Sequence, residues 1–269
     1  MNEVTKGLIS VIMPCYNQAQ YLPDALQSVL SQTYEHWECM IVDDGSTDET
    51  EQVAREWLLR DPRFRYHKLT NSGVSAARNF GISKAKGEFI LPLDGDDKIH
   101  SEYLERAVAV FNADPQVRLV YCKLEYFGLK SDWVLPPYNY KDLLIENMIF
   151  CTALMRKDDI VAMGGYDEEM THGFEDWEFY INFLNSDAKV HCIDKVLFYY
   201  RLKEHSRDAD LSRSKEKMKL TLEYISLKHY KTYTKYYGSM IEVLRQNKEL
   251  TLKNILKNTL KEKIRFLKK

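Results

Sequence analysis

Three aspartates at the end of one apolar segment are the residues best suited to chemistry. The run 88–93 (EFILPL) is followed by Asp94, Gly95, Asp96 and Asp97. Like charges a few ångström apart repel strongly once they are partly desolvated, so this cluster requires a cation. Carboxylate oxygens suit Mg²⁺ or Mn²⁺, which leave coordination positions open for substrate phosphates. The cluster predicts a metal site for a phosphate ester, although an isolated Asp-Gly-Asp-Asp is also typical of a solvated turn that caps a helix.

A second acidic pair ends another apolar segment. Asp43 and Asp44 follow the run 39–42 (CMIV). Ser46 and Glu49 have the spacing of a capping box, which predicts that a helix starts there. The acidic pair would then lie at the carboxyl end of a parallel strand, the edge at which open α/β sheets bind ligands.

The elements that position these acids alternate along the chain. We expect strands at 8–13, 38–42, 63–68, 88–93 and 117–127, and helices at 21–31, 47–60, 74–86 and 101–113. Later come a helix near 176–186 and two short strands, 189–193 and 196–201. This alternation predicts a mainly parallel, doubly wound sheet. The sequence has neither the Gly-x-Gly-x-x-Gly of dinucleotide-binding domains nor a P-loop.

Composition places the chain among globular proteins. With 269 residues, 45% of them hydrophobic, it can bury a core as one large domain, with or without an appendage. Its five cysteines lack paired spacing, which is typical of a reducing compartment. No leader pattern opens the chain and no apolar run approaches bilayer length, so we expect a cytoplasmic protein.

The last 57 residues differ electrostatically from the rest. Segment 213–269 has 16 Lys and Arg against 5 Asp and Glu, a net charge of +11. Because the whole chain has a net charge of −2, residues 1–212 have a net charge of −13. Apolar residues such as Leu252, Ile255 and Leu260 recur at helical spacing. A basic amphipathic helix can lie on an anionic membrane surface, here the inner membrane face, or pack on the protein body. The sequence leaves both alternatives open.

Six segments, taken in order, resemble the family 2 glycosyltransferases, which pass a sugar from a nucleotide diphosphate to an acceptor. They are 10–17 (SVIMPCYN), 42–48 (VDDGSTD), 71–79 (NSGVSAARN), 93–97 (LDGDD), 164–168 (GGYDE) and 174–178 (FEDWE). The resemblance covers residues 8 to about 205. It implies the α/β GT-A (nucleotide-diphospho-sugar transferase) fold, with a C-terminal helical extension. The implied divisions are a nucleotide-sugar half, 1–127, an acceptor half, 128–210, and a basic helical tail, 211–269.

The resemblance assigns most of the early motifs to the nucleotide. The implied nucleotide-binding residues are Pro14, Tyr16, Asp43, Asp44, Asn71, Gly73, Arg78 and Asp94. Chemistry supports this, because a ring and backbone carbonyls can flank a base, a carboxylate can accept a base N–H, and an arginine fork can bond a phosphate. Tyr16 could also be a surface aromatic, Asp43 a turn-stabilising acid, and Arg78 the partner of a salt bridge to Asp94 or Asp44.

The later motifs carry the implied chemistry. The family's Asp-x-Asp motif corresponds to 94–96 and assigns Asp96 to Mn²⁺ or Mg²⁺, which acts as a Lewis acid on the diphosphate. Asp176 is the implied general base for an acceptor hydroxyl, and direct attack gives inversion. The alternative is that Glu175 and Asp176 only favour a helix N-terminus.

Further residues are assigned to the sugar, the acceptor or the metal. Tyr166, Asp167, Glu175 and Trp177 are expected on the sugar or acceptor side, although Trp177 could equally pack in the core. His205 follows the last expected strand, where some relatives place a metal-binding histidine. Its spacing from the preceding Tyr-Arg pair is longer than the commonest family pattern, so a solvent-facing histidine is the alternative.

Together these features predict a metal-dependent, inverting glycosyltransferase. The expected partners are a nucleotide-diphosphate sugar, with a UDP-sugar favoured, and a sugar or lipid-linked acceptor in surface polysaccharide or glycolipid assembly; no nucleic acid is expected. One rival is a non-catalytic nucleotide-sugar-binding protein, which would have no use for Asp176. The other is a sugar-phosphate nucleotidyltransferase, whose Gly-rich, basic opening loop is missing from this sequence.

Overall fold

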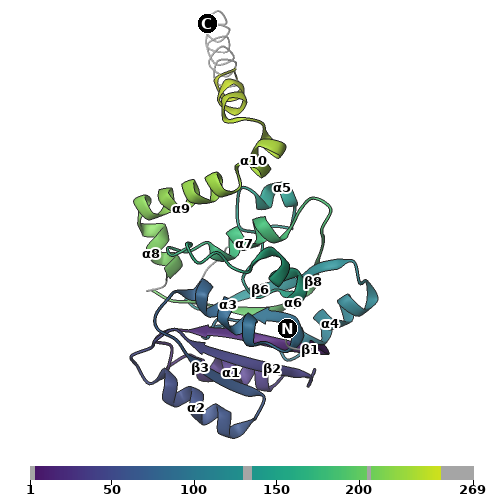
Figure 1. The fold of residues 1–269 in the computed structure, drawn as a ribbon, viewed down its shortest axis with the longest axis vertical. Coiled ribbons are helices and arrows are strands. Elements are labelled where there is room, and N and C mark those ends of the chain that lie inside the picture. Colours follow the sequence, from purple (N-terminus) through teal and green to yellow (C-terminus); the bar gives the residue numbers. More distant parts are fainter. Residues whose placement is uncertain (1–3, 130–134, 205–206, 250–269) are drawn as a thin grey trace, which may run out of the picture. The chain divides into compact units, whose positions relative to one another are not determined.

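One mixed sheet organises the chain in the computed structural model, which describes residues 4–129, 135–204 and 207–249 (Figure 1). In this described part the strand order is β3-β2-β1-β4-β7-β6-β8-β5. The strands are β1 (Thr5–Cys15), β2 (Trp37–Asp43), β3 (Phe64–Lys68), β4 (Gly87–Pro92), β5 (Lys98–Ile99), β6 (Val117–Gly128), β7 (Leu154–Arg156) and β8 (Lys189–Leu202). The helices are α1 (Leu22–Leu30), α2 (Thr50–Arg60), α3 (Val74–Lys84), α4 (Tyr103–Ala113), α5 (Tyr140–Leu143), α6 (Lys157–Met163), α7 (Glu175–Phe183), α8 (Arg207–Arg213), α9 (Lys215–Lys228) and α10 (Tyr230–Tyr237).

The sheet is parallel except for two short strands. Strands β3, β2, β1 and β4 pair in parallel, as do β6 and β8. Strand β7 is antiparallel to both β4 and β6, and β5 is antiparallel to β8. The sequence predicted the parallel strands but neither exception, because segments of three and two residues are too short to show a periodic pattern.

Helices cover both faces of the sheet, which explains why the central strands are apolar throughout. All seven residues of β2 are buried, as expected for a parallel strand covered on both sides. On one face α3 packs so closely that a Cβ on its Gly81 would lie 2.6 Å from the side chain of Ile12. On the other face, the neighbouring Val11 belongs to a core that includes Leu26 of α1 and Leu104 of α4.

Two predicted element boundaries were wrong. Helix α2 begins at Thr50, not near Ser46, because the Ser46 hydroxyl accepts a hydrogen bond from the Asn17 N–H (2.9 Å) instead of capping the helix. The carboxylate of Asp48 accepts the bond from the Thr50 N–H (3.0 Å). The two strands predicted at 189–193 and 196–201 are one strand, β8, whose pairing with β6 shifts register between Ile193 and Val196.

The chain forms two units, Met1–Thr221 and Leu222–Lys269. The first unit contains every strand of the described part, so the predicted halves 1–127 and 128–210 share one sheet. The apolar positions predicted at 252–267 lie outside the described residues. Among the residues that the structure describes, no helix combines the length and the apolar character needed to cross a bilayer.

Candidate active site

Two acidic turns lie at one edge of the sheet. Asp43 ends β2, and Asp94 follows β4 by two residues. Strand β1 lies between these two strands and is parallel to both, so both turns occur at the carboxyl edge, as the sequence predicted. Backbone bonds tie them to the end of β1: the Asp44 N–H donates to the Cys15 carbonyl (2.9 Å) and the Gly95 N–H to the Pro14 carbonyl (3.3 Å).

Backbone amides hold the carboxylate of Asp44. Its two oxygens accept hydrogen bonds from the N–H groups of Ser72 and Gly73, each at 2.8 Å, at the start of α3. Gly73 has φ +95°, a conformation that favours glycine. A Cβ there would meet no atom within 4 Å, so the backbone conformation and not a lack of space favours glycine at this position. Asn71 is exposed beside this turn. The helix N-terminus therefore stabilises the negative charge of Asp44.

Asp43 has the turn-stabilising role that the sequence left as an alternative. Its carboxylate is fully buried and accepts bonds from the Ser46 N–H (2.7 Å) and the Tyr66 hydroxyl (2.6 Å). Contact of Asp43 with a nucleobase stays a prediction. Near this turn, Pro14 is buried, whereas Tyr16 is 47% exposed and presents its ring to solvent.

A polar clip joins the turn after β1 to the turn after β2. The Asn17 side-chain oxygen accepts a bond from the Thr47 N–H (2.8 Å), and the Asn17 N–H donates to Ser46. Asn17 has φ +51°, a left-handed conformation that asparagine tolerates better than most residues. Sequence reasoning had not singled out Asn17, although it ends the first motif. The clip fixes the two turns in place.

Arg78 connects the second acidic turn with α7. It is 1% exposed, and its guanidinium donates to Asp94 Oδ1 (2.7 Å) and to Glu175 Oε1 (2.8 Å). The salt bridge to Asp94 that the sequence offered as an alternative is therefore present. Cys151 Sγ donates to the other Asp94 oxygen (3.7 Å). Direct contact between Arg78 and a nucleotide stays a prediction.

Glu175 is a buried anion between two arginines. Besides Arg78, it accepts a bond from Arg207 Nη2 (2.6 Å), and it is only 2% exposed. Burial by itself raises the pKa of Glu175, but the charges of Arg207 and Arg78 outweigh burial and lower the pKa to about 2. Glu175 thus anchors the first turn of α7, and its contact with an acceptor stays a prediction.

Asp176, the predicted base, follows Glu175 in the first turn of α7 and is partly exposed; its Oδ1 accepts a bond from the Trp177 N–H (2.7 Å). Trp177 is buried and its indole N–H donates to the Leu143 carbonyl (2.6 Å), so it has the core position that the sequence left open. Tyr166 is also buried and stacks on Phe179. Asp167 is partly exposed nearby in the sequence.

The remaining acids of the second turn contact the end of β8. The carboxylate of Asp96 forms an ion pair with the ammonium of Lys203. Arg201 donates from Nε to the Asp96 carbonyl (2.7 Å) and from its backbone N–H to Asp97 Oδ1 (2.8 Å). Asp97 Oδ2 is buried and has no hydrogen-bond partner within the described part of the chain. Burial, and then the charges of Asp96 and Asp94, raise the pKa of the Asp97 carboxyl well above its ordinary value.

The oxygen atoms of this turn match the ligand chemistry of a divalent cation, but the described residues do not form a complete metal site. Among the described residues, no group of three or more His, Cys, Asp or Glu side chains is arranged to hold a metal ion. The turn nevertheless supplies carboxylate oxygens of the right chemistry, including the unpartnered, buried Asp97 Oδ2. Such a donor set suits an ion that takes its other ligands from a diphosphate and water. His205 lies outside the described residues.

Sequence reasoning did not single out Lys203. It follows the Tyr200-Arg201 pair at the end of β8, the place where a histidine was expected. The sequence did offer a signal for Lys203, because this basic residue comes directly after a strand whose end lies beside the acidic turn.

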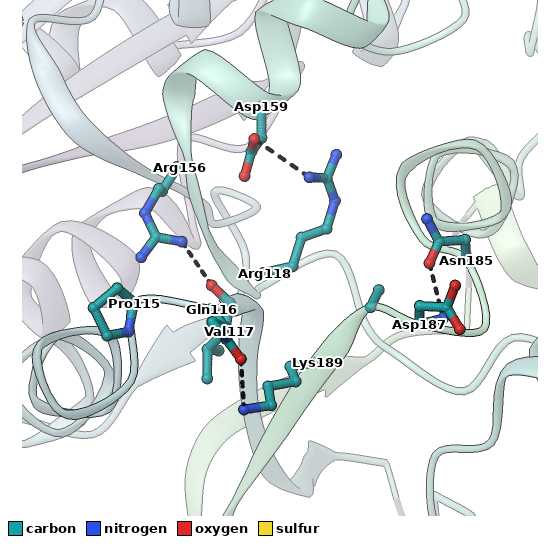
Figure 2. A pocket seen from close by; sticks show the side chains of 10 residues that line it. Pro115, Gln116, Val117, Arg118, Arg156, Asp159, Asn185, Asp187 and Lys189 are labelled. Carbon is teal, nitrogen blue, oxygen red and sulfur yellow. Dashed lines mark hydrogen bonds and ion pairs between the residues drawn. The ribbon is translucent and has the colours of Figure 1, made fainter.

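A separate pocket lies away from these residues. It has a volume of about 470 Å³ and is lined at the amino ends of β6 and β8 by Val117 and Lys189 (Figure 2). These ends belong to the edge of the sheet opposite the acidic turns. Its basic residues have partners: Arg118 pairs with Asp159 (3.3 Å), Lys189 pairs with Asp114 (2.9 Å), and Arg156 donates to the Val117 carbonyl (2.6 Å). None of the predicted site residues lines this pocket.

Comparison with known proteins identifies the family. The model of glycosyl transferase family 2 matches residues 10–168, more than half of the chain. A glycosyltransferase of Rickettsia typhi is 32% identical over 63% of this chain and 57% of its own length. Glycosyltransferase GlyA of Streptococcus pneumoniae is 30% identical over 74% of this chain and 31% of its own length. The chain therefore spans about a third to somewhat over half of these two relatives.

Solved structures show the same fold. TarS of S. aureus, in complex with UDP-GlcNAc, has a TM-score of 0.62 at 22% identity, over 87% of this chain and 77% of that chain. The mannosyltransferase PcManGT of Pyrobaculum calidifontis, in complex with GDP-Man and Mn²⁺, has a TM-score of 0.58 at 19% identity, over 91% of this chain and 80% of that chain. The fold is of the GT-A type, as predicted, and the chain belongs to glycosyl transferase family 2.

Proposed function

We propose that this glycosyltransferase moves a sugar from a nucleotide-diphosphate donor to an acceptor hydroxyl with inversion, and that it requires a divalent cation. The observation that carries the proposal is the connection of the two acidic turns with Asp176. Asp44 and Asp94 follow β2 and β4, the strands on either side of β1, at the same edge of the sheet, and Arg78 joins Asp94 to Glu175, the residue before Asp176. Nucleotide, diphosphate and acceptor groups would thus be held on one connected frame.

The first acidic turn would bind the nucleoside. The exposed ring of Tyr16 offers a stacking surface for a base, and Asn71 and Gly73 form an exposed backbone segment beside Asp44. The Asp44 carboxylate has two amide partners, and each oxygen keeps a lone pair for a base N–H. A UDP-sugar is the favoured donor, since TarS binds UDP-GlcNAc in the same fold; PcManGT with GDP-Man makes GDP-sugars the alternative.

The second acidic turn would hold the diphosphate end. Asp94 would face the ribose, and Asp96 with the buried oxygen of Asp97 would hold Mn²⁺ or Mg²⁺. When bound, the ion supplies Lewis-acid stabilisation of the charge that develops on the departing nucleoside diphosphate. PcManGT, which has this fold, was solved with Mn²⁺. His205 is a further candidate ligand.

Asp176 would act as the general base. It is partly exposed, in contrast to its buried neighbours Glu175 and Trp177, and is therefore the acid of this turn that an acceptor hydroxyl can reach. The hydroxyl would lose its proton to Asp176 and attack the anomeric carbon directly, on the face opposite the departing nucleoside diphosphate, and this direct displacement would invert that carbon. The fixed position of Glu175 between two arginines keeps the first turn of α7 in place during this step.

The variant Asp176→Asn tests the assignment of the base. We expect transfer to fall by roughly 10²–10⁴-fold, the usual contribution of a positioned base, while binding of the sugar nucleotide stays unchanged. Asp187→Asn is the matched control, because it removes the same charge from an exposed position in the pocket at the opposite edge. Full transfer activity of Asp176→Asn would rule out this base, and loss of donor binding would show that the residue holds the donor instead.

The basic tail suggests where the enzyme works. Segment 213–269 carries 16 basic against 5 acidic residues, which favours attraction to anionic lipid. We propose peripheral attachment to the inner membrane face, beside a lipid-linked or polysaccharide acceptor. The full chain should sediment with vesicles containing anionic lipid and stay in solution with neutral vesicles. A chain that stays in solution with both kinds of vesicle would remove the membrane role, and equal sedimentation with both would rule out attraction to anionic lipid.

A further inference from the structure

The ion pair between Lys203 and Asp96 is placed where a metal ion would have to bind. Its members are partly shielded, since the side chains are 21% and 13% exposed. The ammonium also lies 5.0 Å from the centre of the Tyr21 ring. Lys203 therefore has a defined position against one carboxylate and one aromatic face, and it neutralises Asp96 when no ligand is present.

The three acids of this turn have different partners. Asp94 pairs with Arg78, which is 1% exposed and bonds a second carboxylate as well. Among the described residues, the Asp97 carboxylate accepts one hydrogen bond, from the backbone N–H of Arg201. Asp96 is the acid of this turn that pairs with a lysine, a compact charge on a flexible stem that is still in contact with solvent. Arg78 is buried and held by two carboxylates. Lys203 is partly exposed and has one carboxylate partner, so its ammonium can move into solvent when it leaves Asp96.

We propose that Lys203 is an internal counter-cation that occupies Asp96 in the nucleotide-free protein and must leave before a divalent ion binds there. This inference rests on the proposed function, because it takes Asp96 as a metal ligand. Its consequence is weak metal binding in the absence of donor. The diphosphate that arrives with the ion offers the displaced ammonium new acceptors, so metal and donor bind best together.

Titration of Mn²⁺ into nucleotide-free, full-length protein, followed by the electron paramagnetic resonance signal of free Mn²⁺, tests the inference without any measurement of activity. Lys203→Met keeps most of the stem and removes the competing charge, so we expect Mn²⁺ to bind up to about fivefold tighter than to the wild type, the factor for loss of one modest ion pair. Lys203→Arg keeps a cation and should bind Mn²⁺ as weakly as the wild type. Unchanged or weaker binding by Lys203→Met would overturn the proposal.

Lys98 provides the matched control. It follows Asp97 directly, but its ammonium lies over the Phe127 ring (4.3 Å). Lys98→Met removes the same charge from the same region, so it measures the general electrostatic effect on a nearby cation. We expect its gain in Mn²⁺ affinity to be clearly smaller than that of Lys203→Met. Equal gains would overturn direct competition.

A double variant locates the effect. Addition of Asp96→Asn to Lys203→Met should abolish the gain in affinity, and a gain that persists would overturn competition at Asp96. Absence of Mn²⁺ binding by all variants would also overturn the proposed competition. The proposed function has a separate test: it fails if the wild type transfers no sugar from any nucleotide donor. Thermal melting curves check that each variant is folded. If Lys203→Met is unfolded, Lys203→Gln, which is also neutral, replaces it in the same titration.

Discussion

The two acidic turns at the carboxyl edge differ in what neutralises them. The first is held by backbone: Asp44 accepts two amide N–H groups and Asp43 accepts one, together with a tyrosine hydroxyl. The second is held mainly by cationic side chains, with Arg78 on Asp94 and Lys203 on Asp96. Backbone amides cannot leave their acceptor without local unfolding, whereas a lysine can change partner by rotation of its side chain.

Under the proposed function, this difference would assign the nucleoside to the first turn and the diphosphate to the second. A turn that is fixed by amides is preformed and suits a part of the donor that does not change, the nucleoside. A turn that is fixed by exchangeable cations suits the diphosphate, whose arrival brings charge that must be balanced. Arg78 is the exception in the second turn, because it is buried and shared between two carboxylates.

Removal of Arg78 is the largest expected change in stability. Arg78→Met leaves Glu175 and Asp94 without their shared cation, so we expect a loss of about 3–5 kcal/mol in the free energy of unfolding, measured with urea. Arg55→Met is the control, because Arg55 makes an exposed pair with Glu51 and lies 5.4 Å from the centre of the Tyr66 ring, so its removal should cost far less. Similar losses for the two variants would show that the buried network does not organise the second turn.

Acid should weaken the same network. The pKa of Glu175 is lowered from 4.5 to about 2, so its stabilising effect is complete above pH 4.5 and is lost as pH falls through 4.5 toward 2. The full effect is roughly 3 kcal/mol at 1.4 kcal/mol per pKa unit. The free energy of unfolding, measured with urea at several pH values, should fall less steeply below pH 4.5 for Glu175→Gln than for the wild type. The same pH dependence in both proteins would contradict the assigned role of Glu175.

A smaller loss is expected in the first turn. Asp44→Asn keeps one oxygen acceptor but places an NH₂ against the other backbone N–H, which should cost about 1–2 kcal/mol. Because the partners are amides at short range, this loss should be nearly the same in 0.05 M and 1 M salt. A loss that disappears in high salt would show that the first turn is held by long-range charge instead of by hydrogen bonds to backbone amides.

The smallest expected loss belongs to Lys203. Lys203→Met should cost about 1 kcal/mol or less at low salt, because the pair is in contact with solvent, and less still in 1 M salt. The comparison between the turns therefore predicts that salt reduces the loss from Lys203→Met and leaves the loss from Asp44→Asn nearly unchanged. A loss from Lys203→Met as large as that from Arg78→Met would mean that this lysine is fixed, not exchangeable.

Local patterns were sufficient to predict the sheet edge and its acids. Asp44 and Asp96 follow apolar runs that form β2 and β4, and strand alternation placed their ends together. Contacts between distant segments could not be predicted: Arg78 meets Glu175 across 97 residues and Asp96 meets Lys203 across 107. The capping box failed for the same reason, since Asn17 takes the Ser46 hydroxyl and no local rule includes that competitor.

The most direct test of the account is calorimetric titration of UDP and of GDP, each with and without Mn²⁺, into the wild type and Asp96→Asn. We expect Mn²⁺ to strengthen the binding of at least one nucleotide to the wild type by about tenfold or more, because diphosphate and carboxylate share the ion. Asp96→Asn should lose this increment and keep the metal-independent binding that the first turn provides. If the wild type binds both nucleotides with the same affinity in the presence and absence of Mn²⁺, the account is contradicted.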